Sequence, residues 1–212
     1  MKHLCLFCVA SMAFMALASS NVDDVVAPAP EYSGTMGHGP VWTGPFAVLF
    51  DNGPFVNSIG TGYGGADESI MAPDEQTYGF GCQYSLTIRL SDQFEVPAGE
   101  TWEISSITGF GYQTNSGLPS TLNGYYMAIH DGTPDVGPVV YGDPDTDFFT
   151  SSEFTNCYRV TSTTSGNNSR PIMTIYCEFA DLQLGEGTYW INWAVTGTSS
   201  SGPWGNPVTI TG

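Results

Sequence analysis

Three aspartates at alternate positions, Asp143, Asp145 and Asp147, form the densest group of metal-ligand side chains in the sequence. We expect them in a loop, where carboxylates so spaced can converge on one hard cation such as Ca²⁺. The pattern departs from an EF-hand, because Phe148 stands where glycine is needed and Glu153 falls one position short of the bidentate glutamate. The alternative is a solvated turn whose aspartates hydrogen-bond the local backbone and hold no ion. A Ca²⁺ site and a simple turn therefore both remain open.

An aromatic strand near the C-terminus supplies a second candidate site. In the predicted strand 189–195, Trp190 and Asn192 share one face, and Trp193 lies on the other. An outward-facing Trp190 beside Asn192 suits a sugar ring, whose C–H face stacks on indole while the amide bonds a hydroxyl. The alternative is that both tryptophans are packed inside the protein, where Trp204 or loops would cover them.

Sequence patterns for catalysis are weaker than those for the candidate Ca²⁺ and sugar sites. His130 and Asp131 are neighbours on a predicted strand, so their side chains point to opposite faces and form no relay. No Gly-x-Ser-x-Gly, zinc-binding His-Glu or Cys-His pattern occurs in the sequence. Pairs of carboxylates suited to glycoside hydrolysis are numerous, but their spacing selects none of them. We assign no catalytic residue and expect that the protein is not an enzyme.

The charge balance restricts the class of partner. The 212-residue chain has 21 Asp and Glu against 4 Lys and Arg, a formal net charge of −17. Nucleic-acid binding needs clustered basic residues, so it is not expected here. The 13% aromatic content argues against disorder, which is typical of chains poor in such residues. With so few bases, we expect Arg159 and Arg170 to pair with acids near a hairpin, or else to contact a partner.

Residues 1–18 have the pattern of a secretory signal peptide. Lys2 provides a positive start, an apolar stretch follows, and Ala16 to Ala18 form a small-x-small cleavage site. The apolar run is shorter than the roughly 20 residues that a bilayer span needs. We therefore expect cleavage near Ala18 and a secreted or cell-surface protein with no transmembrane segment in the mature chain.

Three cysteines remain after the predicted signal peptide: Cys82, Cys157 and Cys177. Disulfides persist outside the cell. A hairpin centred on residue 167 would set Cys157 opposite Cys177, so we predict a cross-strand disulfide between them. The alternative is two buried thiols. Cys82 is left over, either buried or available to another chain.

The rest of the chain predicts a β protein. Residues 19–45 are rich in proline and glycine and are expected to form a leader or linker. From residue 46 to 212, short alternating runs are separated by turn residues, and no long helical stripe occurs. This pattern favours one all-β domain, an antiparallel β-sandwich of jelly-roll type. The runs are 84–90, 101–104 with a parity shift at 105–107 that indicates a bulge, 125–130, 138–141, 158–160, 172–179 and 188–195.

An ordered set of short phrases from residue 48 to the end resembles a family of secreted bacterial domains. The family is found in exported proteins with cell-surface sorting tails, and the resemblance implies a β-sandwich of unassigned function. No catalytic residue is established for it, so none is carried over. The phrases are Leu49-Phe50-Asp51-Asn52-Gly53-Pro54, Gly64-Gly65-Ala66-Asp67, Ser91-Asp92-Gln93-Phe94, Val96-Pro97-Ala98-Gly99, Gly111-Tyr112-Gln113-Thr114, Ile129-His130-Asp131-Gly132, Tyr158-Arg159-Val160, Arg170-Pro171-Ile172-Met173, Gly187-Thr188-Tyr189-Trp190 and Gly202-Pro203-Trp204.

Two departures from the family shape the functional expectation. Relatives usually continue past the Gly-Pro-Trp phrase and carry a sorting tail, whereas this sequence stops at Gly212. Either the sequence is a fragment, or a final strand is missing and its sheet edge is open to another chain. We expect a structural or assembly subunit of the cell surface or extracellular matrix, with copies of itself or other surface proteins as partners. The alternatives are a carbohydrate-binding accessory domain and, with less support, a secreted hydrolase.

Overall fold

In a computed structural model of the chain, residues 3–8, 48–72 and 77–207 are described. This part of the protein is all-β, as the sequence predicts. Neither of its two 3₁₀ turns, η1 (Tyr63–Gly65) and η2 (Tyr84–Leu86), has the length or apolar character of a membrane-spanning helix. Its ten strands are β1 (His3–Cys8), β2 (Phe50–Asp51), β3 (Asp67–Met71), β4 (Phe80–Gly81), β5 (Leu90–Tyr112), β6 (Leu122–Asp131), β7 (Val139–Asp147), β8 (Phe154–Thr161), β9 (Pro171–Gly197) and β10 (Trp204–Gly205).

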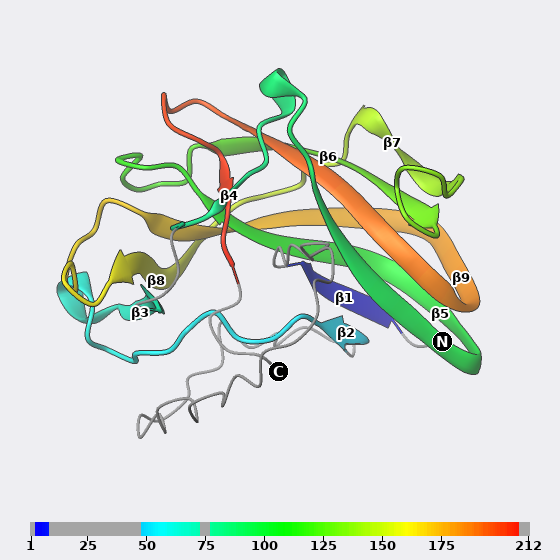
Figure 1. The fold of residues 1–212 in the computed structure, drawn as a ribbon, viewed down its shortest axis with the longest axis horizontal. Helices are drawn as coiled ribbons and strands as arrows, with labels where there is room; N and C mark the ends of the chain where they lie inside the picture. Colours follow the sequence, from blue (N-terminus) through cyan, green and yellow to red (C-terminus); the bar gives the residue numbers. More distant parts are fainter. Residues whose placement is uncertain (1–2, 9–47, 73–76, 208–212) are drawn as a thin grey trace, which may run out of the picture.

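Two long strands form the frame of the sheet. β9 lies between β5 and β6 and is antiparallel to both, within the order β2-β1-β5-β9-β6-β7. Figure 1 shows β5 and β9 as long ribbons side by side. β3 and β8 lie together at the left of the same view. The sheet is mixed rather than purely antiparallel, because β1 is parallel to β2 and β5, and β3 is parallel to β8.

Alternating apolar residues account for the position of these strands. On β9, Ile191, Trp193 and Val195 are fully buried and belong to the main core cluster, as does Met127 of β6. The predicted runs 125–130 and 188–195 therefore lie within β6 and β9. The register of β5 against β9 shifts between Ile104 and Ser106, which confirms the bulge indicated by the parity change.

The predicted strand over residues 84–90 is wrong. Tyr84 to Leu86 form the 3₁₀ turn η2, Thr87 follows in the left-handed region with φ 56°, and β5 begins only at Leu90. The amides of Leu86 and Ile88 both donate to the carbonyl of Gln83, so the chain turns back on itself. Leu86 and Ile88 are exposed, whereas Tyr84 of the same segment stacks on Tyr126 of β6.

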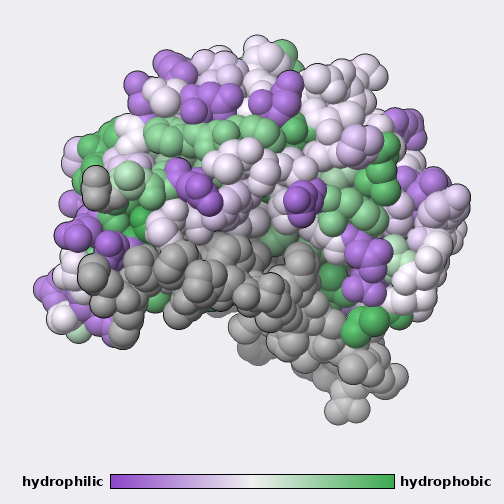
Figure 2. All heavy atoms as spheres, turned by 180° about the vertical axis from the view of Figure 1, so that it is seen from behind, coloured by the Kyte–Doolittle hydropathy of each residue, from purple (hydrophilic) through white to green (hydrophobic). Residues whose placement is uncertain are grey.

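Some apolar surface reaches solvent away from the core. The most exposed large apolar side chains include Val136, Leu86 and Ile59. On the back of the molecule, Figure 2 shows apolar residues gathered in a band that is bordered by polar ones.

A buried carboxylate joins β3 to the loop between β8 and β9. Glu68 is fully buried, and its oxygens accept hydrogen bonds from the hydroxyls of Thr61 and Ser165 and from the amide of Gly166. Charged side chains are rarely buried unless such donors replace the lost water. Glu68 therefore fixes one end of the fold.

We predict that Glu68→Ala lowers the free energy of unfolding by about 1–3 kcal/mol, because it removes three hydrogen bonds that a buried carboxylate accepts. Urea denaturation measures the change. The matched control is Glu95→Ala on the exposed face of β5, which should change stability by no more than about 0.5 kcal/mol. Equal effects of the two substitutions would contradict this role of Glu68.

Candidate functional site

The three aspartates of the candidate Ca²⁺ site lie in β7 and its bulge rather than in a free loop, and all are exposed. Asp143 Oδ1 accepts from the amide of Asp145, and Asp145 Oδ1 lies 3.8 Å from the Arg89 guanidinium. Asp147 Oδ1 accepts from the amides of Tyr125 and Phe149. In the described ranges, no three His, Cys, Asp or Glu side chains are grouped to hold a metal ion. The Ca²⁺ site stays a prediction.

The candidate sugar site on β9 is only partly open. Trp193 is fully buried in the core, while Trp190 and Asn192 on the opposite face are half-buried. Trp190 stands opposite Gln93 on β5 and His130 on β6, so strands flank it on both sides. Asn192 Oδ1 is buried without a hydrogen-bond partner. Neither Trp190 nor Asn192 lines one of the two cavities observed among the described residues. Ligand binding at this face stays a prediction.

The predicted Cys157–Cys177 disulfide is absent: both side chains are buried free thiols. The β8–β9 pairing sets Tyr158 opposite Pro171, so the hairpin is centred nearer residue 165 than residue 167. Cys157 therefore packs in a small cluster with Phe55 and Phe110, whereas Cys177 lies in the main core, opposite Ile107 on β5. The sequence pattern located the hairpin but not its register.

The third cysteine, Cys82, is also a fully buried free thiol. Burial raises the pKa of the Cys82 thiol far above its usual value, since the charged thiolate is poorly solvated there. Burial has the same effect on the pKa of Cys157. These thiols are packing groups rather than nucleophiles, because the thiolate is the reactive form.

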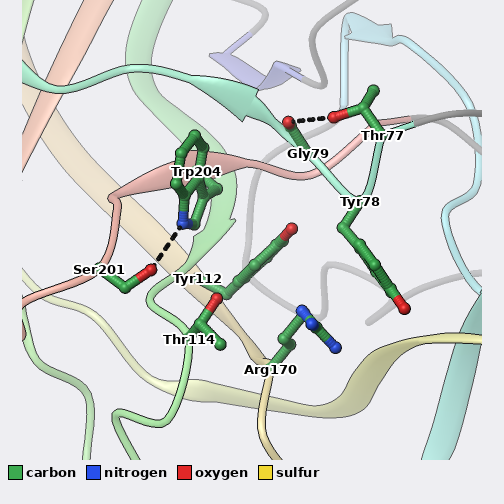
Figure 3. A pocket seen from close by; sticks show the side chains of 8 residues that line it. All are labelled: Thr77, Tyr78, Gly79, Tyr112, Thr114, Arg170, Ser201 and Trp204. Atoms are coloured by element: carbon green, nitrogen blue, oxygen red, sulfur yellow. Dashed lines mark hydrogen bonds between the residues drawn. The ribbon is translucent and has the colours of Figure 1, made fainter. Parts of the chain in front are cut away.

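A pocket with a volume of about 250 Å³ lies where four segments distant in sequence meet. We call it the aromatic–arginine pocket (Figure 3); its lining residues are Thr77, Tyr78, Gly79, Tyr112, Thr114, Arg170, Ser201 and Trp204.

Strand pairing brings these segments together. Trp204 on β10 pairs with Tyr112, the last residue of β5, on one side and with Gly81 of β4 on the other. β5 pairs in turn with the first part of β9, which Arg170 precedes. Tyr78 comes just before β4. The pocket is therefore built at one end of a four-strand arrangement, β4-β10-β5-β9.

Arg170 and Tyr78 form one wall. The guanidinium carbon of Arg170 lies 3.8 Å from the centroid of the Tyr78 ring, within the range of a favourable cation–π contact. Figure 3 shows the two side chains stacked, with Tyr112 between them and Trp204. The Trp204 indole Nε1 donates to Ser201 Oγ at 3.3 Å, which orients the ring.

A second arginine supports this wall from inside. Arg159 is fully buried, and its Nε donates to the backbone carbonyl of Tyr78 at 2.9 Å, while Nη1 donates to Ser69 Oγ at 3.2 Å. Burial raises the pKa of the Tyr112 hydroxyl, and the positive charges of Arg159 and Arg170 act against this rise. Two of the three arginines in the chain thus lie within electrostatic reach of one tyrosine.

Two glycines permit the close approach of the pocket segments. A Cβ at Gly79 would lie 2.7 Å from the Tyr112 hydroxyl, and one at Gly111 would lie 2.8 Å from the Trp204 carbonyl oxygen. Either contact is too short for a real side chain, so the two positions require glycine unless the strands move apart.

The sequence singled out only part of this site. Arg170 was expected to pair with acids near the hairpin, but it lies on an aromatic ring instead. Tyr78 and Trp204 were not predicted as a site. The available signal was weak: three of the phrases that carry the family resemblance contain Tyr112, Arg170 and Trp204, yet no local spacing places them together.

The described lining supplies several kinds of binding group. It contains three aromatic rings, the hydroxyls of two threonines and one serine, and one guanidinium, and no carboxylate, histidine or thiol is among these described lining residues. Comparisons of the chain with protein-family models, with curated proteins and with solved structures find no match.

We predict that Cys82, Cys157 and Cys177 of the folded protein resist a thiol-specific alkylating reagent, and that all three react at once in urea without a reductant. Burial blocks the reagent and keeps the thiols protonated. Mass spectrometry of peptides from both samples counts the labels. Failure of Cys157 and Cys177 to react in urea until a reductant is added would show a disulfide and contradict the structure.

Proposed function

We propose that this protein is an exported, non-catalytic binding domain that takes up a sugar ring in the aromatic–arginine pocket. The observation that carries the proposal is the composition of the described lining: aromatic rings and hydroxyl groups surround a cavity, and none of these lining residues is acidic. Ring faces pack against the C–H faces of a sugar, and hydroxyl groups of Thr77, Thr114 and Ser201 exchange hydrogen bonds with those of the ligand.

The size of the pocket suits one sugar ring rather than an extended ligand. Its volume of about 250 Å³ is just below the range of about 300–1,000 Å³ typical of pockets for drug-sized molecules. A terminal or branch residue of a glycan would enter it, with the rest of the chain in solvent.

The proposed location is extracellular, on the strength of the signal-peptide pattern in residues 1–18.

The proposed architecture is the jelly-roll sandwich predicted above. The pairing of β5 with β9 supports this architecture, because it is antiparallel. Its register shifts mark bulges, and a strand bends at a bulge. The parallel pairs β1–β5 and β3–β8 are departures from that topology.

The edge of β5 favours a second candidate function, the assembly of neighbouring copies. Along residues 103–109, β5 pairs with β9 on one side and with β1 on the other, from His3 opposite Glu103 to Cys8 opposite Gly109. Because β1 lies within the predicted signal peptide, cleavage near Ala18 would remove this strand. Ile104 and Ile107, now buried, would then border an unpaired edge that a strand of a second copy can extend.

We predict that Trp204→Ala weakens binding to a sugar identified on a glycan array at least tenfold, because truncating an aromatic anchor commonly costs about 2 kcal/mol or more. Isothermal titration calorimetry measures the affinity, and thermal melting checks that the variant is folded. Trp190→Ala is the matched control, since Trp190 lies outside the pocket. Loss of binding in Trp190→Ala, with Trp204→Ala unchanged, would place the ligand on β9 instead.

For the assembly function, we predict that a chain beginning at Ser19 self-associates with rising concentration, because it lacks β1 and exposes the β5 edge. The control is the chain that retains residues 1–18, which should remain monomeric. Light scattering coupled to gel filtration gives the mass of each, and hydrogen exchange should slow at residues 103–109 upon association. Monomers at all concentrations for the chain beginning at Ser19 would rule this function out.

A further inference from the structure

Among the described residues that line the aromatic–arginine pocket, Arg170 carries the one charged group, its guanidinium. No hydrogen bond or ion pair among the described residues uses this guanidinium; its observed contact is the stack on Tyr78. The residue is half-buried, so part of its charge is withdrawn from water, and no described residue supplies an acceptor for it. Such an arrangement is costly unless a ligand supplies the missing acceptors.

The surroundings of Arg170 are unusual for this chain. Acidic residues outnumber arginine and lysine by 21 to 4 in the sequence, yet none of the acidic residues that the structure describes lines the pocket. Arg159 lies behind the wall and adds a second positive charge that acts on Tyr112. The described lining of the pocket is therefore positively charged in a strongly negative protein. An anionic group gains attraction there that it would find at few other places on this surface.

The geometry selects a planar anion. Stacking on Tyr78 fixes the plane of the guanidinium, and the N–H groups along its edge remain available as a fork. A carboxylate accepts two parallel hydrogen bonds from such a fork. The hydroxyl-bearing residues Thr77, Thr114 and Ser201 are placed around the same cavity to meet neutral polar groups of the same ligand.

We propose that the ligand of the aromatic–arginine pocket is a sugar that carries a carboxylate, a hexuronate residue of an acidic polysaccharide. Arg170 binds the carboxylate, and the faces of Tyr112 and Trp204 and the neighbouring hydroxyls bind the ring. This inference rests on the proposed sugar-binding function and narrows it to one class of sugar.

The experiment compares two ligands that differ in charge and in the methyl group that each ester carries. Trigalacturonate and its methyl ester are titrated into the full-length mature protein by calorimetry, with a trisaccharide of galactose as a neutral reference. We expect at least tenfold tighter binding of the acid than of the ester. Arg170→Gln should remove this preference and leave ester binding unchanged. Arg170→Lys keeps the charge but loses the fork, so it should recover only part of the preference.

Arg89→Gln is the matched control, because Arg89 is a half-buried arginine beside Asp145 and away from the pocket. It should leave both affinities unchanged. Equal binding of acid and ester by the wild type, with no effect of Arg170→Gln, would overturn the inference while the sugar-binding function stands. Failure to bind any of the three ligands, together with a glycan array that detects no sugar, would overturn the proposed function itself.

Discussion

The pairing of β9 with β5 is the interaction on which the rest of the structure depends. β9 spans Pro171–Gly197 and supplies one edge to β5 and the other to β6, so it fixes the register of the three strands around the main core. Its first part also sets the end of β5 beside Arg170, and β10 and β4 add to that end in turn. A slip of one residue would turn each side chain of a strand to the opposite face. Such a slip between β5 and β9 would therefore disrupt both the main core and the aromatic–arginine pocket.

The same frame explains how so acidic a chain keeps two arginines close together. Arg159 is satisfied inside the protein by the Tyr78 carbonyl and the Ser69 hydroxyl, and it holds the segment that carries the Tyr78 ring. Arg170 packs on that ring from the pocket side. One arginine therefore builds the wall, and the other is presented on it. A guanidinium that is positioned in advance loses little side-chain freedom when an anion binds.

Local patterns predicted the parts of the fold that local chemistry decides. Alternation identified the strand segments now in β6 and β9, and a change of parity located the bulge near Ser105. Register was harder to predict: a hairpin centre misplaced by about two residues produced a disulfide that the structure lacks. The pocket could not be predicted, because Tyr78, Tyr112, Arg170 and Trp204 meet only through long-range pairing. The short phrases that contain three of these residues do not show, before the sheet is known, that the residues share one site.

The scarcity of arginine makes the central claim directly measurable. The described part of the chain contains three, Arg89, Arg159 and Arg170, so a ¹H–¹⁵N spectrum of the arginine Nε–Hε groups resolves each one. Titration with trigalacturonate should shift the Arg170 signal strongly and saturably, shift the buried Arg159 signal slightly, and leave the Arg89 signal in place. An Arg170 signal that does not move while the sugar binds would contradict the account, because the ligand would then occupy another site.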